Sequence, residues 1–105
     1  MRVDDINFET DVERSTLPVL VTFGAAWCKP CKALNKTLDG MVHEYRDRVR
    51  FVHVDIQHAT VAGQKYDVRT VPTLIVFKDG VPAGSLVGNQ PRGKIEDLLS
   101  VVLAR

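Results

Sequence analysis

Three segments rich in apolar, β-branched and aromatic residues mark the strands of this chain. They occupy residues 19–24, 49–55 and 74–77. The first and third are apolar almost throughout, which predicts central strands covered on both faces of a sheet. The second also contains Arg50, His53 and Asp55, and we expect it to be a second central strand. Asp79-Gly80, which follows the third run, is a strong two-residue hairpin signal. It predicts that residues 82–87 return antiparallel beside residues 73–78.

Apolar positions three or four residues apart predict the helices. We expect helices over residues 5–15, 28–46 and 59–66 and from Pro91 toward the C-terminus, where proline suits a first helical turn. The second helix has the clearest apolar stripe, formed by Leu34, Leu38, Met41, Val42 and Tyr45. Gly40 lies within that stripe. A glycine there weakens a helix by about 1 kcal/mol, and we expect the helix to continue through it.

The order of these elements predicts an α/β fold with a mixed sheet. The early strand–helix–strand units favour parallel pairing, and the hairpin adds an antiparallel edge. Arg2-Val3 is a candidate stub of edge strand. With 105 residues, the chain is expected to form one domain over residues 1–105. In such sheets the functional site lies beyond the carboxyl ends of the strands.

Composition and charge exclude several classes of function. The 14 basic and 13 acidic side chains leave a net charge of +1, which provides no basic surface for nucleic acid or for an anionic membrane. No apolar run approaches the roughly 18 residues of a membrane helix. The N-terminus lacks the apolar core of a signal peptide. We therefore expect a cytoplasmic protein. We also expect it to act as a monomer.

Both cysteines of the chain, Cys28 and Cys31, lie where the first apolar run turns into a predicted helix. Two thiols at i and i+3 share one face of a helical turn, with Cα atoms roughly 5–6 Å apart, within disulfide range. The helix N-terminus and Lys29 favour a thiolate on Cys28, whose pKa is expected to fall from about 8.5 to about 7 or below. Cys28 is expected to be partly exposed and to attack, Cys31 to be more buried and to resolve, and Pro30 to stiffen the turn between them.

Other interpretations of these residues remain open at this point. A zinc site needs four ligands, and the other candidates, His43, His53 and His58, lie in separate segments without finger-like spacing. Two inert buried cysteines are the other alternative. Trp27 is equally consistent with core packing and with a flat apolar surface beside the sulfurs.

Two sequence blocks resemble the thioredoxin family. Phe23-Gly24-Ala25-Ala26-Trp27-Cys28-Lys29-Pro30-Cys31-Lys32 is similar to the family's active-site segment, with Lys29 in place of a glycine. Val68-Arg69-Thr70-Val71-Pro72-Thr73-Leu74 is similar to the segment that carries the family's cis-proline. Phe77-Lys78-Asp79-Gly80 and Val87-Gly88 continue the likeness in order and spacing. The resemblance covers nearly the whole chain.

The resemblance implies a thioredoxin fold, with a central mixed sheet of four to five strands flanked by four helices. It implies a protein thiol–disulfide oxidoreductase that reduces protein disulfides. No metal or bound cofactor is needed, and an upstream thioredoxin reductase supplies the electrons. Pro72 would be cis, the backbone of Val71 would pair with the substrate peptide, and the apolar docking surface would comprise Trp27, Val71, Pro72, Val87 and Gly88.

The sequence also departs from the family pattern near the cysteines. Thr22 stands where the family has a buried aspartate that assists proton transfer, and threonine cannot ionise. His53 replaces a lysine on the adjacent strand, either as a packed residue or as a proton carrier. Lys36 replaces a kinking proline, which favours a straighter helix, and Gly24 replaces an aromatic residue. Lys29 should stabilise the Cys28 thiolate and make the protein more oxidising.

Three functions are consistent with these residues. The first is a general protein-disulfide reductase that uses Cys28 and Cys31. The second is a thioredoxin-fold binding module with little turnover, which the loss of the carboxylate at position 22 would favour. The third is a more oxidising exchange protein, an oxidase or isomerase, for which the absence of a signal sequence is unfavourable.

Overall fold

A five-stranded mixed sheet forms the centre of the protein in a computed structural model that describes residues 2–105. The strands are β1 (Arg2–Val3), β2 (Val19–Gly24), β3 (Arg50–Asp55), β4 (Thr73–Lys78) and β5 (Val81–Val87), in the spatial order β1-β3-β2-β4-β5. β3 runs parallel to β1 and β2, whereas β4 is antiparallel to both β2 and β5. The predicted mixed sheet and its edge stub are confirmed.

The hairpin after β4 follows the sequence prediction. Asp79 and Gly80 both have positive φ, 55° and 81°, as a two-residue turn with the twist of a β-hairpin requires. Val81 pairs with Lys78, the register shifts by one residue between Val76 and Phe77, and Val87 at the far end of β5 pairs with Thr73. The turn and this irregularity together place Val87 beside the start of β4.

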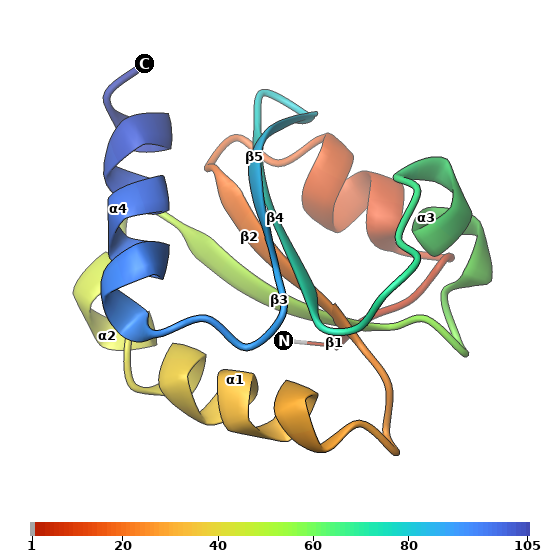
Figure 1. Ribbon diagram of the computed structural model, residues 1–105. Coiled ribbons are helices and arrows are strands. Elements are labelled where there is room, and N and C mark those ends of the chain that lie inside the picture. The colour runs from red at the N-terminus through yellow and green to blue at the C-terminus, as the bar shows by residue number, and fades with distance from the viewer. Residues whose placement is uncertain (1) are drawn as a thin grey trace.

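Helices cover both faces of the sheet (Figure 1). A short π-helical segment, η1 (Glu9–Glu13), and α3 (Thr60–Lys65) lie on one face, and α1 (Lys29–Asp39), α2 (Val42–Tyr45) and α4 (Arg92–Leu103) lie on the other. Each face has its own buried cluster: Phe8 and Phe77 belong to the first, Leu34 and Leu99 to the second. Because β2 contributes side chains to both clusters, its uninterrupted apolar sequence is explained.

The first predicted helix is much shorter than expected. Residues 5–15 contain only the five-residue segment η1, closed by a hydrogen bond from Arg14 N–H to the Glu9 carbonyl (2.8 Å). The Asp4 carboxylate accepts from the backbone of Ile6 (2.9 Å) and Asn7 (3.4 Å). Such local hydrogen bonds from a side chain stabilise a turn in place of a helix. The helical segment that contains Val12 is therefore only about one turn long, despite the helical spacing of Phe8 and Val12.

The second predicted helix is divided, and the expectation that it continues through Gly40 is wrong. α1 runs without interruption through Lys36 and ends at Asp39, and α2 begins at Val42. At the break, Met41 N–H bonds to the Leu38 carbonyl (2.9 Å), three residues back, and the Met41 side chain is fully buried. The break therefore directs the Met41 side chain into the core. Interrupting the helix at Gly40 costs little free energy, because glycine is a weak helix former.

Candidate active site

Cys28 and Cys31 form a disulfide at the start of α1, with Cα atoms 5.3 Å apart, within the predicted range. β2 ends at Gly24, and a turn closed by Cys28 N–H bonding to the Ala25 carbonyl (3.1 Å) leads into the helix. The predicted position of the pair beyond the carboxyl end of a central strand is confirmed. The backbone of the chain, rather than long side chains, therefore fixes where the sulfurs lie.

Cys28 is itself the N-cap residue of α1. Its backbone is extended (φ −90°, ψ 108°), and its Sγ accepts a hydrogen bond from Cys31 N–H at 3.2 Å. Pro30 lies in the first turn, as predicted, where its missing N–H has no helical partner to lose. An N-cap atom that receives helix N–H groups lies at the positive end of the macrodipole, so this position favours negative charge on the Cys28 sulfur.

The charges around the disulfide add to this effect. Lys29 and Lys32 are exposed on the first turn of α1, which contains no acidic residue. Their positive charge therefore also favours a negative charge on the Cys28 sulfur.

Within residues 2–105 no cluster of three His, Cys, Asp or Glu side chains is arranged to hold a metal ion. No helix in the described part of the chain is long and apolar enough to cross a membrane.

The two sulfur-bearing residues are buried to the same extent, which corrects the expectation that Cys28 is the more exposed. Their residue exposures are 4% for Cys28 and 3% for Cys31. In the disulfide form both pack with Ala25, and Ile56 and Val71 lie against this group. The two cysteines therefore differ in backbone position rather than in exposure: Cys28 is the N-cap residue of α1, and Cys31 lies within the helix.

The residues of the predicted docking surface have different exposures around this disulfide. Trp27 is 67% exposed, so it is not a core residue, and Val87 is also exposed. Val71 packs on the cysteines, and the Val71–Pro72 bond is cis, as the resemblance implied. The Pro72 carbonyl accepts from Gly88 N–H at 2.8 Å, which joins the two loop segments. The hydrogen bonds within residues 2–105 leave both backbone polar groups of Val71 free.

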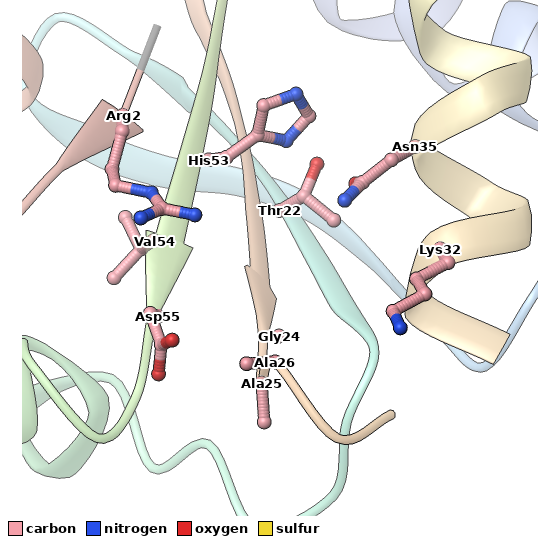
Figure 2. A pocket seen from close by; sticks show the side chains of 10 residues that line it. All are labelled: Arg2, Thr22, Gly24, Ala25, Ala26, Lys32, Asn35, His53, Val54 and Asp55. Atoms are coloured by element: carbon pink, nitrogen blue, oxygen red, sulfur yellow. The ribbon is translucent and has the colours of Figure 1, made fainter. Parts of the chain in front are cut away.

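Behind the disulfide, between the sheet and α1, lies an open cavity of about 280 Å³ that both apolar and polar residues line. Thr22 on β2 and His53 on β3 are register partners and share this face. Figure 2 shows their side chains and that of Asn35 pointing toward one another from two strands and α1. Asn35 was not predicted, although it follows Cys31 by four residues, a spacing that places both on one face of the helix.

The electrostatics of His53 follow from its place beside this cavity. Burial is the main cause that lowers the pKa of its imidazole, the Asp39 carboxylate partly opposes this by raising that pKa, and Arg2 on the neighbouring strand lowers it by a smaller amount. Its Nε2 lies 3.9 Å from an Asp39 carboxylate oxygen. His53 is therefore mainly neutral at pH 7, and a neutral imidazole has one nitrogen able to accept a proton.

Comparisons with known proteins agree with this geometry. The model of the family described as thioredoxin matches residues 1–101. Thioredoxin C-2 of Corynebacterium nephridii is 42% identical over 91 residues, which cover 87% of this chain and 84% of the relative. Thioredoxin 1 of Synechococcus elongatus is 35% identical over 97 residues, 92% of this chain and 91% of the relative. The likeness to each of these proteins thus spans the fold and the cysteine pair together.

Proposed function

The chain belongs to the thioredoxin family, and from this membership we propose the roles of its individual residues. The protein is a thiol–disulfide oxidoreductase with protein-disulfide reductase activity, and its active-site disulfide joins Cys28 and Cys31. One observation supports the order of the two steps: Cys28 Sγ is the atom that caps α1 and accepts the Cys31 N–H.

In the first step, the Cys28 thiolate attacks one sulfur of a substrate disulfide. The substrate S–S bond breaks, one substrate thiol leaves, and a mixed disulfide joins Cys28 to the other substrate sulfur. Cys31 then attacks the Cys28 sulfur, the second substrate thiol leaves, and the Cys28–Cys31 disulfide remains. The substrate gains two electrons, which the dithiol loses. We propose that a thioredoxin reductase restores the dithiol and that the protein works as a single-domain monomer in the cytoplasm.

Substrate docking is assigned to the exposed apolar surface beside the disulfide. Trp27 and Val87 supply apolar area, and Val71 supplies free backbone groups next to the sulfurs. A peptide in extended conformation can hydrogen-bond to such a backbone as an added strand. Pro72 and Gly88 hold Val71 and Val87 in place through the bond between their loops. Binding of this kind depends little on the identity of the substrate's side chains, which suits a reductase with many protein targets.

Insulin reduction by dithiothreitol tests both parts of this proposal. The wild-type protein should accelerate it, and absence of acceleration would favour a binding module with little turnover. Trp27→Ala should raise KM for insulin by about three- to tenfold, because a large exposed aromatic carries much of a contact's binding energy. Val101→Ala is the matched control: Val101 is exposed on α4, away from the disulfide, and its loss should leave KM unchanged. An equal KM in all three proteins would contradict the docking assignment.

Lys29 is assigned to tuning the reduction potential. A unit charge roughly 6 Å from the sulfur, in a medium close to water, stabilises the thiolate by about 0.7 kcal/mol. Because 1.4 kcal/mol corresponds to about 30 mV for two electrons, Lys29→Gly should lower the potential by on the order of 15 mV. Equilibration with a glutathione redox buffer measures the value. A wild-type potential equal to or below that of Lys29→Gly would contradict the assignment.

A further inference from the structure

Three buried polar atoms face the cavity behind the disulfide without a partner in the described part of the chain. They are Thr22 Oγ1, Asn35 Oδ1 and His53 Nδ1. Thr22 is only 3% exposed. A buried polar group left unpaired costs about 1–3 kcal/mol, so three such atoms around one cavity indicate that water bound there completes their hydrogen bonds. At about 280 Å³, with roughly 30 Å³ for each water molecule, it has room for several.

Gly24 is the connection between this cavity and Cys31. Gly24 lines it, and a Cβ added at Gly24 would lie 3.2 Å from Cys31 Sγ. The absence of a side chain at position 24 therefore leaves no atoms beyond the Gly24 backbone between the cavity and the Cys31 sulfur on this side. Lys32 and Asp55 lie at its rim, and Arg2 lines it from β1. Water in the cavity would thus lie beside Gly24, the neighbour of the resolving cysteine, and beside the side chain of His53, which Figure 2 shows facing the same space.

We propose that His53 is the proton acceptor for Cys31, through water held in this cavity by Thr22 and Asn35. The inference rests on the proposed role of Cys31 as the resolving cysteine. In the mixed disulfide, the Cys31 thiol gives its proton through water to His53 Nδ1, and the resulting thiolate attacks Cys28 Sγ. The Cys28–substrate S–S bond breaks, the substrate leaves as a thiolate, and His53 later returns its proton to solvent. His53 acts through water, so it is a positioning and proton-accepting residue for this step.

The groups that face His53 suit this role. The Asp39 carboxylate lies beside Nε2, the nitrogen on the opposite side of the ring from the unpartnered Nδ1. Burial is the main cause that lowers the pKa of the imidazole and keeps it neutral at pH 7, and Arg2 on β1 makes a smaller contribution in the same direction. Lys32 and Asp55 on the cavity rim carry opposite charges. A neutral imidazole with an unpartnered nitrogen beside the cavity, and a carboxylate 3.9 Å from its other nitrogen to stabilise the protonated form, is suited to accept a proton as a general base.

The reaction of the reduced protein with 5,5′-dithiobis(2-nitrobenzoate) separates this step from the first. Attack by Cys28 releases one coloured thiolate in a phase that depends on reagent concentration. Attack by Cys31 releases the second in a phase that does not. Because burial lowers the pKa of His53, we expect the wild-type second phase to stay fast through about pH 6.5, the ordinary pKa of histidine, and to slow only at lower pH, where His53 becomes protonated.

His53→Gln should slow the second phase at pH 7 by about ten- to a hundredfold, the lower part of the range for general-base catalysis. The difference from wild type should shrink toward pH 9, where the Cys31 thiol ionises without help. The first phase should not change. His43→Gln, which removes an exposed histidine on α2, is the matched control and should behave as wild type throughout.

Thr22→Val removes the cavity hydroxyl at nearly constant volume and provides a second variant if His53→Gln unfolds. It should shift the second phase in the same direction. An unchanged pH profile in either folded variant, or a slowing that is equal at every pH, overturns the relay while leaving the roles of the cysteines intact. Release of the second thiolate by Cys31→Ser would instead contradict the proposed function itself.

Discussion

Cys28→Ser is expected to reduce insulin no faster than dithiothreitol does alone, a loss of at least about a thousandfold in catalysed turnover. The serine hydroxyl keeps the capping position at the start of α1, where Cys28 Sγ now accepts from Cys31 N–H. A hydroxyl is not ionised at neutral pH and cannot form a disulfide, so neither step of the exchange can begin. The insulin assay at equal protein concentration measures the loss.

Cys31→Ser is the matched variant, and its expected result is different. It retains the Cys28 thiol, so the first step proceeds and stops at the mixed disulfide. Intact-mass measurement should find one substrate chain on each protein molecule, released by added dithiothreitol. No adduct on Cys31→Ser, or an adduct on Cys28→Ser that is equally abundant, would contradict the assigned order of attack.

Gly80→Ala is expected to lower the free energy of unfolding by about 2–4 kcal/mol. Gly80 has φ +81°, and this left-handed conformation costs an L-residue about 1–2 kcal/mol. A Cβ there would also lie 2.3 Å from the backbone oxygen of Glu13, a contact that requires the segment at the end of η1 to move. Urea denaturation measures the change, and a loss below about 0.5 kcal/mol would contradict this explanation of the hairpin.

Gly93→Ala provides the control for the same chemical change. Gly93 lies in the first turn of α4, and no atom would come within 4 Å of an added Cβ. Alanine is a better helix former than glycine by about 0.5–1 kcal/mol, so this variant should be slightly more stable than wild type. Destabilisation by both substitutions would indicate that the loss at Gly80 does not come from its turn geometry.

The sheet could be predicted from the sequence because its signals are local. The apolar run of β2 and the Asp79-Gly80 turn each determine an element within a few residues. The helix predictions were wrong where other interactions compete with the apolar spacing. The Asp4 side chain replaces the start of the first helix with a turn, and burial of Met41 favours a break at Gly40. Neither effect is visible in the apolar spacing.

The candidate site shows the same division. The positions of Cys28 and Cys31 follow from the strand–helix turn, and the importance of Thr22, Gly24 and His53 could be seen from departures at single positions. The cavity that unites them could not be predicted, since it depends on the register between β2 and β3 and on the approach of α1. Equal burial of the two cysteines likewise results from the disulfide, which packs both sulfurs into one group.

A single turnover without dithiothreitol tests the exchange between Cys28 and Cys31 most directly. Fully reduced protein is mixed with an equal amount of a peptide that contains one disulfide, and both are then measured by intact mass and by thiol titration. Each protein molecule should lose two hydrogen atoms and gain the Cys28–Cys31 disulfide, while each peptide gains two thiols. A protein that remains a dithiol, or that accumulates as a mixed disulfide without releasing the peptide, would contradict exchange between Cys28 and Cys31.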